Sequence, residues 1–239
     1  MESIKVYNIA SAQGFLSSKY SANTKLLIHA GEADTTAGTD IIDSASGHTI
    51  TAVANAQVDT AYSRMGTGSV MFDGTGDGLS LDDHADWNLG TGAFTIHMHT
   101  RFGAIGGVTR TLFSQYVDVN NYFYLQYGGT SFTFYVNVSG SRIVSMIAPA
   151  TIVEGQWYHV AVIRGWGGVA NSFAITVEGR AIGTTTADIT MPDLAAVLGV
   201  GYIVPTPAYS MIGHIDEFTW VKGEAVWVAD FTPPSFLST

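Results

Sequence analysis

The sequence predicts an all-β fold, an antiparallel β-sandwich with about a dozen short strands. Three observations support this class. Apolar and polar residues alternate along residues 94–102, as in a strand with one face in a core. Stretches rich in aromatic and β-branched residues recur, and clusters of Gly, Asp and Asn separate them at short intervals. No stretch of the 239 residues has the 3.6-residue period of an amphipathic helix.

The alternation is clearest in residues 94–102, where Phe94, Ile96, Met98 and Phe102 fall on one face. A hairpin is expected where two Gly residues separate two aromatic stretches. A second hairpin is expected where Glu-Gly-Arg separates two shorter strands. The expected strands after the first are residues 122–127, 132–138, 157–164, 173–177, 181–185 and 212–221.

Residues 1–24 differ from the rest, because they are mostly small and polar and show no sustained period. We expect either an arm or linker that contacts a neighbour, or a loosely packed terminus. Residues 25–239 show no shift in composition and no internal repeat, so they are expected to form one domain.

The composition excludes several classes of protein. Charged residues make up 13% of the chain and apolar residues 46%, the reverse of a disordered chain. The chain has no Cys, so a disulfide scaffold is excluded. Its net charge of −10 argues against nucleic acid or an anionic membrane as a partner. No transmembrane helix or secretion signal is expected, because long apolar runs are absent.

Eight short segments carry a family resemblance. They are residues 26–29 (LLIH), 43–50 (DSASGHTI), 69–77 (SVMFDGTGD), 92–96 (GAFTI), 155–162 (GQWYHVAV), 177–180 (VEGR), 213–218 (GHIDEF) and 230–234 (DFTPP). Together and in this order they resemble the laminin-G-like, concanavalin-A-like jelly-roll family. More narrowly, they are similar to copies that bacteriophages carry as virion surface proteins.

The resemblance implies a non-enzymatic bacteriophage virion surface protein, either a capsid decoration protein or a fibre-like component. Its partners would be the major capsid protein or a tail component, contacted partly through residues 1–24. A homo-oligomer such as a trimer would suit a capsid site. The alternative is a lectin-like adhesion domain that recognises host-surface glycans. One fold supports many functions, so both interpretations stay open at this point.

An enzyme is not expected. Related glycosidases carry Glu-x-Asp-x-(x)-Glu on one strand, which supplies the nucleophile and the acid/base. The comparable strand here has His214 in place of the first Glu and no second Glu at either spacing. Asp216 and Glu217 are adjacent, so we expect them on opposite faces of the strand, where they cannot flank one glycosidic bond.

Calcium is the one cofactor that the resemblance implies, because family members often bind it at the rim of the sandwich. Asp43 and Asp216 are the expected ligands, since hard oxygen atoms from two neighbouring loops suit Ca²⁺. The alternative is structural: Asp43 would cap a turn, and Asp216 would accept a hydrogen bond.

Two tryptophans and three histidines are further candidates for contact or ligand residues. Trp87 and Trp166 stand in loop-like contexts and are expected to contact a carbohydrate or a protein partner. His97 and His99 share one face of the first expected strand, which we expect to be a solvated or interface face in preference to a zinc site. His159 lies in an apolar strand and is expected to be a hydrogen-bonded core residue.

Overall fold

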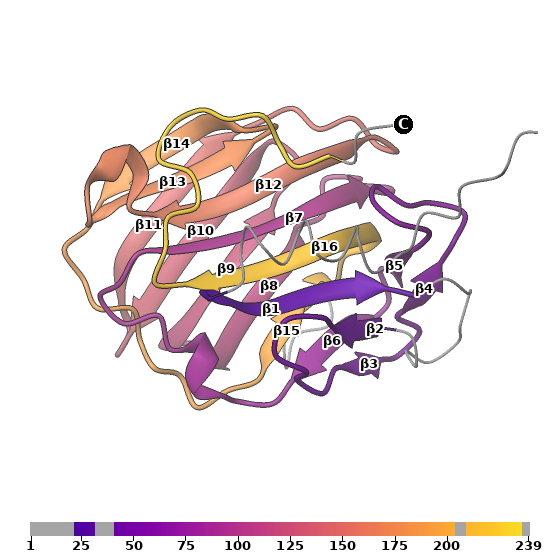
Figure 1. The fold of residues 1–239 in the computed structure, drawn as a ribbon, viewed down its shortest axis with the longest axis horizontal. Coiled ribbons are helices and arrows are strands. Elements are labelled where there is room, and N and C mark those ends of the chain that lie inside the picture. The colour runs from indigo at the N-terminus through magenta and orange to yellow at the C-terminus, as the bar shows by residue number, and fades with distance from the viewer. Residues whose placement is uncertain (1–21, 32–40, 204–208, 236–239) are drawn as a thin grey trace, which may run out of the picture.

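The structure is a computed structural model that describes residues 22–31, 41–203 and 209–235. Two antiparallel sheets pack face to face as a sandwich (Figure 1). The all-β sandwich predicted from the sequence is therefore confirmed. Within the described residues, no helix is long and apolar enough to cross a membrane.

The strands divide between a nine-stranded and a seven-stranded sheet. The first contains β1 (Thr24–Ala30), β2 (Ile41–Asp43), β4 (Gln57–Asp59), β5 (Ser69–Asp73), β7 (Phe94–Phe102), β12 (Trp157–Arg164), β13 (Ser172–Val177), β14 (Arg180–Thr186) and β16 (Ile212–Lys222). The second contains β3 (Thr51–Val53), β6 (Gly78–Leu81), β8 (Arg110–Asp118), β9 (Asn121–Tyr127), β10 (Ser131–Val138), β11 (Ser141–Pro149) and β15 (Leu198–Val200). The 3₁₀ helices η1 (Ala85–Trp87) and η2 (Trp166–Gly168) lie in loops.

The order of the strands brings distant parts of the chain together. The nine-stranded sheet runs β14-β13-β12-β7-β16-β1-β2, with β5 beside β16 and β4 beside β5. The seven-stranded sheet runs β11-β10-β9-β8-β15-β6-β3. The hairpins predicted from the sequence are the pairs β9–β10 and β13–β14.

The core lies between the sheets, where each strand contributes its inward residues. On β7, the four apolar residues predicted to share a face, Phe94, Ile96, Met98 and Phe102, are all fully buried. Aromatic rings meet across the gap. The ring of Phe113 on β8 lies 6.1 Å from that of Trp220 on β16.

The outer face of β7 is buried as well, because the chain after β16 covers it. The rings of Trp227 and Phe231 stack in parallel at 3.9 Å. Beneath them, His159 Nε2 lies 3.2 Å from His97 Nδ1. His97 is 3% exposed and His99 1%. The expected solvated or interface face at His97 and His99 is therefore wrong, whereas His159 is a buried, hydrogen-bonded residue as predicted.

β16 contains a β-bulge where it pairs with β7. Asp216 pairs with His99. The next pair along the ladder is Thr219 with His97, so two residues of β16 oppose one residue of β7. Glu217 takes up the extra residue with a φ of 52°, the left-handed conformation that such bulges use.

The bulge places Asp216 and Glu217 together on the outer face of the sheet. Glu217 Oε1 lies 2.5 Å from His29 Nδ1. Asp216 Oδ2 accepts the backbone N–H groups of Arg64 and Met65, both at 2.8 Å. The expectation that the two carboxylates point to opposite faces is wrong, because it assumed an unbroken alternation. Both side chains are nevertheless buried, at 2% exposure.

Burial perturbs the ionisable groups around the bulge in opposite directions. It raises the pKa of Asp216 to about 7, and the nearby Glu217 charge adds to the rise. Burial lowers the pKa of His99 to about 4, and the positive charge of Arg64 acts in the same direction. The pKa of His159 is lowered too, chiefly by burial. Below neutral pH the folded protein therefore holds a proton on Asp216 that the unfolded chain has lost, and it lacks protons that unfolded histidines bind.

We predict that Asp216→Asn removes the contribution of Asp216 to the pH dependence of stability and leaves that of the buried histidines. The pKa of Asp216 is raised in the folded state, so its contribution to stability is largest below about pH 4 and is lost as the pH rises to about 7. Asn keeps an acceptor for the two N–H groups and does not titrate. The unfolding free energy of the variant, relative to wild type, should therefore rise between pH 4 and 7 by up to about 1.4 kcal/mol per pH unit. Urea unfolding at several pH values measures this difference.

The exposed Asp83→Asn makes the same chemical change without burial and serves as the control. Its stability difference from wild type should stay nearly constant over the same pH range. A constant difference for Asp216→Asn would show that Asp216 has the same pKa in the folded and unfolded chains, contrary to the prediction.

Candidate functional site

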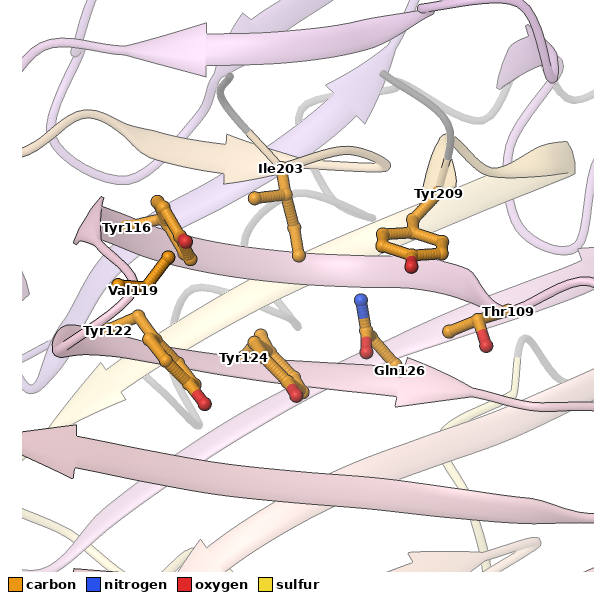
Figure 2. A pocket seen from close by; sticks show the side chains of 8 residues that line it. All are labelled: Thr109, Tyr116, Val119, Tyr122, Tyr124, Gln126, Ile203 and Tyr209. Carbon is orange, nitrogen blue, oxygen red and sulfur yellow. The ribbon is translucent and has the colours of Figure 1, made fainter. Parts of the chain in front are cut away.

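A pocket of about 310 Å³ opens on the outer face of the seven-stranded sheet (Figure 2). Its floor is formed by side chains of β8 and β9, and its far wall by the segments that flank the connection from β15 to β16. The described residues that line it are aromatic, aliphatic or neutral polar, with no Asp or Glu. They are Thr109, Tyr116, Val119, Tyr122, Tyr124, Gln126, Ile203 and Tyr209.

The alternation of β9 explains why this face carries tyrosines. Phe123 and Leu125 point into the core and are fully buried. Because successive side chains of a strand point to opposite faces, Tyr122, Tyr124 and Gln126 must then point outward. One set of alternate residues of β9 therefore lies in the core, and the other set lines the pocket.

Three of these tyrosines form a stacked row. Tyr116 of β8 pairs across the ladder with Tyr122, and their rings lie 5.4 Å apart at 17°. The rings of Tyr122 and Tyr124 lie 5.1 Å apart and are parallel within 2°. In Figure 2 the hydroxyl groups of Tyr122 and Tyr124 point the same way, away from Ile203 and Tyr209.

Arg142 on β11 holds the row from the side. Its guanidinium lies over the ring of Tyr135, 3.6 Å from the centroid. Its Nη2 donates to the hydroxyl of Tyr122 at 3.3 Å, and its Nε donates to Asn137 Oδ1 at 3.2 Å. These contacts fix the Tyr122 hydroxyl before any ligand arrives, which lowers the entropy lost on binding.

The hydroxyls of Tyr116 and Tyr124 keep their protons at neutral pH. Burial raises the pKa of Tyr124, and the neighbouring Tyr122 adds to the rise. Burial also raises the pKa of Tyr116. A neutral phenol both donates and accepts hydrogen bonds, so these hydroxyls can bond to either a donor or an acceptor of a ligand without carrying a charge.

The opposite wall adds apolar surface. Ile203 is 4% exposed and Tyr209 is 42% exposed. Arg110 Nη1 donates to the carbonyl of Ser210 at 3.1 Å, which ties this wall to the start of β8. The pocket therefore combines an aromatic ring with a partly open face, an aliphatic side chain and a row of hydroxyls.

The tryptophans expected from the sequence lie elsewhere. Trp87 is 1% exposed, and its Nε1 donates to the carbonyl of Asp82 at 3.0 Å. Trp87 does lie in a loop, in η1, but the expectation that it is exposed is wrong, because its indole packs edge-on against Trp220 at 5.8 Å in the core. Trp166 is half-buried in η2 and does not line the pocket. Its role as a carbohydrate or partner contact stays a prediction.

Sequence reasoning missed the tyrosine row, although a signal was present. Tyr122 and Tyr124 are two residues apart in a stretch assigned to a strand, so they had to share a face. Tyr116 could not be added without the register of β8 on β9, which is a tertiary property.

Asp43 and Asp216, the expected calcium ligands, both accept hydrogen bonds from backbone N–H groups. Asp43 Oδ1 accepts from Leu27 and Ala45, at 3.0 and 2.9 Å. Asp43 Oδ2 accepts from Ser46 and His48, at 3.2 and 2.9 Å.

This arrangement does not favour a cation on Asp43, because amide donors already point at both of its oxygens. Ca²⁺ takes six to eight oxygen ligands, and of this pair only Asp216 Oδ1 lacks a hydrogen bond. The pair therefore does not fit a calcium ion in this conformation, and calcium binding stays a prediction for titration. The arm expected at residues 1–24 lies almost wholly outside the described residues, which begin at residue 22.

Known structures resemble this fold at low sequence identity. The binding domain of Paraclostridial Mosquitocidal Protein 1 matches with a TM-score of 0.66 and 11% identity over 87% of this chain and 51% of that one. The binding domain of botulinum neurotoxin serotype D matches with 0.64 and 12%, over 84% and 49%. Botulinum neurotoxin type C, whose cell entry depends on interaction with two ganglioside molecules, matches with 0.61 and 12%, over 87% and 50%.

The chain spans about half the length of these structures, and their likeness shows the fold alone. No curated protein matches the sequence. One family model, described as Concanavalin A-like lectin/glucanases superfamily, laminin G type 3, matches residues 73–225, which is more than half of the chain. The jelly-roll resemblance of the eight segments is thus confirmed, and the chain belongs to the concanavalin A-like lectin/glucanases superfamily.

Proposed function

We propose that this protein is a non-catalytic, lectin-like domain that binds carbohydrate in the tyrosine-lined pocket. The observation that carries the proposal is the stacked row of tyrosine rings on the floor of a hollow, with the partly exposed ring of Tyr209 on its far wall. A sugar ring presents hydroxyl groups at its rim and C–H groups on its faces. The row can hydrogen-bond to the rim, and Tyr209 can pack against a C–H face.

The size and chemistry of the pocket agree with binding. About 310 Å³ lies at the lower end of the range for small-molecule sites, which suits one or two sugar rings. A retaining or inverting glycosidase needs two carboxyl groups on either side of the scissile bond. The described residues lining this pocket supply none, which supports binding over hydrolysis.

The comparisons support the same interpretation without deciding it. The superfamily includes lectins, and structures with this fold are binding domains of toxins. One of those toxins interacts with gangliosides, which are glycolipids. Because the match covers only half of that structure, the proposal that this chain binds carbohydrate rests on its own tyrosine pocket.

The matched pair Tyr209→Ala and Tyr62→Ala tests the pocket. Tyr209 is 42% exposed at the pocket wall, and Tyr62 is 44% exposed near β4 and β5 of the other sheet. A glycan array first identifies a ligand, and calorimetry then measures its dissociation constant. Tyr209→Ala should weaken binding at least about tenfold, equivalent to about 1.4 kcal/mol. Tyr62→Ala should leave it unchanged.

Tyr124→Phe refines the test, because it removes a hydroxyl and keeps the ring. It should weaken binding through a lost hydrogen bond, while thermal unfolding shows the fold intact. An array without any binder, or equal affinities for Tyr209→Ala and wild type, would refute the carbohydrate proposal.

We further propose that the domain acts on the surface of a bacteriophage virion, as a capsid decoration or fibre-like component. The support is the resemblance of the eight sequence segments and the polar stretch of residues 1–24. An extended segment can add to a neighbouring sheet, so this stretch is suited to contact the major capsid protein or a tail component, and a homo-oligomer would multiply weak contacts. Glycan binding and virion attachment are compatible, since they use different parts of the chain.

Deletion of residues 1–22 tests the attachment. The deletion keeps Asn23, whose carbonyl accepts the N–H of Lys222 and whose Nδ2 donates to Glu224 at 2.9 Å. The described domain should therefore stay folded, with an unchanged melting temperature, while incorporation into the particle is lost. Cryo-electron microscopy of the particle locates the full-length chain. Normal incorporation of the shortened chain would contradict the role of the arm.

A further inference from the structure

Three ligand-type side chains converge beside η1, away from the tyrosine pocket. They are His48, from the loop before β3, and His84 and Asp86, from the turn after β6. His48 Nε2 lies 3.1 Å from Asp86 Oδ2, and His84 Nδ1 lies 3.2 Å from the same oxygen. All three ligand atoms lie within 4.8 Å of one another.

These distances suit a tetrahedral metal ion. Zn²⁺ binds imidazole nitrogen and carboxylate oxygen at about 2.0–2.2 Å, so neighbouring ligand atoms in a tetrahedron lie roughly 3.3 Å apart. The two measured separations differ from this by 0.1 to 0.2 Å. The separation of the two nitrogens can adjust, because the side chain of His84 is 51% exposed.

Asp43 positions the first of these ligands. Its Oδ2 accepts the backbone N–H of His48 at 2.9 Å, within the set of four amide hydrogen bonds that shapes this loop. Trp87 lies beneath both imidazoles, with its ring centroid 4.8 Å from that of His48 and 6.2 Å from that of His84. The ligands therefore stand on a packed support, which is what a preorganised site requires.

The hydrogen bonds indicate a place for a positive charge. His84 Nδ1 accepts the backbone N–H of Asp86 at 3.2 Å, so its lone pair faces this residue. The carboxylate oxygen at 3.2 Å is an acceptor too. Two acceptors in contact repel each other unless a proton or a cation lies between them. A cation between them would join both acceptors to His48 Nε2, and the lone pair of His84 Nδ1 would then turn from the N–H of Asp86 to the ion.

We propose that His48, His84 and Asp86 form a binding site for a Zn²⁺-like transition-metal ion. Two imidazoles and one carboxylate are the ligand types that Zn²⁺ prefers, whereas Ca²⁺ prefers oxygen alone. The half-exposed His84 leaves the fourth position open to solvent, so water or a donor from another molecule completes the tetrahedron. Lys222 Nζ is nearby but donates to the carbonyl of Ala85 at 2.8 Å, which engages its charge outside the ligand set.

Calorimetry on the full-length, chelator-stripped protein tests the site with ZnCl₂ as the probe. One ion should bind per chain with micromolar or tighter affinity, and it should raise the melting temperature as its concentration rises. His48→Gln and Asp86→Asn should each weaken binding by more than about tenfold. CaCl₂ at the same concentration should not compete. Binding should also weaken on acidification, because the ion must displace protons from its ligands.

Asp83→Asn is the matched control for Asp86→Asn, because it removes the same charge from the same turn. Asp83 lies within three residues of His84 and Asp86 but is not a member of the cluster. It should leave zinc affinity within about twofold of wild type. Co²⁺ in place of Zn²⁺ gives a second readout, since tetrahedral and octahedral complexes differ in their visible absorption. Should His48→Gln fail to fold, Asp86→Asn and the Co²⁺ spectrum decide the question.

Absence of zinc binding would overturn the proposal. So would equal affinities for Asp86→Asn and wild type, or equal losses for Asp86→Asn and Asp83→Asn, which would indicate general attraction by negative charge. An octahedral Co²⁺ spectrum insensitive to His48→Gln would have the same consequence. Each of these results concerns η1 and the loop before β3, so none bears on carbohydrate binding at β8 and β9.

Discussion

The burial of aromatic side chains between the two sheets is the constraint on which the functional face depends. Phe113 meets Phe218 and Trp220 across the gap, both at 6.1 Å, and Phe123 lies 6.2 Å from Trp220. A slip of one residue in any of these strands would move its apolar set into solvent. Because the inner set is fixed in this way, the outward direction of Tyr122 and Tyr124 is fixed with it. The core residues of β9 therefore determine which way the pocket tyrosines of the same strand point.

Much of the architecture follows from local patterns in the sequence. The alternation of residues 94–102, the paired Gly before β10 and the Glu178-Gly179 turn predicted strands and hairpins that the structure contains. The left-handed φ values at Glu178 and Gly179, 50° and 73°, match the turn that a two-residue hairpin needs. These features depend on neighbours in the sequence, which is why they could be read from it.

What could not be predicted depends on contacts between distant segments. The bulge at Glu217 interrupts a strand whose composition is regular, so alternation gave the wrong face for one carboxylate. His97 packs against Trp227, which lies more than a hundred residues later in the chain, and His99 packs against His159, which Trp227 and Phe231 contact. Trp87 follows a polar turn in the sequence but returns to the core through a 3₁₀ helix. In each case the local pattern omitted a feature that depends on pairing or packing with a distant segment.

The neighbouring positions of β1 and β16 have a consequence for how the chain is made. Leu26 of β1 pairs with Trp220 of β16, so the first and last described strands lie side by side within the nine-stranded sheet. During synthesis, β1 leaves the ribosome long before its partner exists, and its apolar residues have no permanent neighbour on that side. Pairings of such high sequence separation are slow to form and leave strand edges open. This part of the sheet therefore cannot close before β16 has left the ribosome, and until then the edge of β1 that β16 will cover stays open.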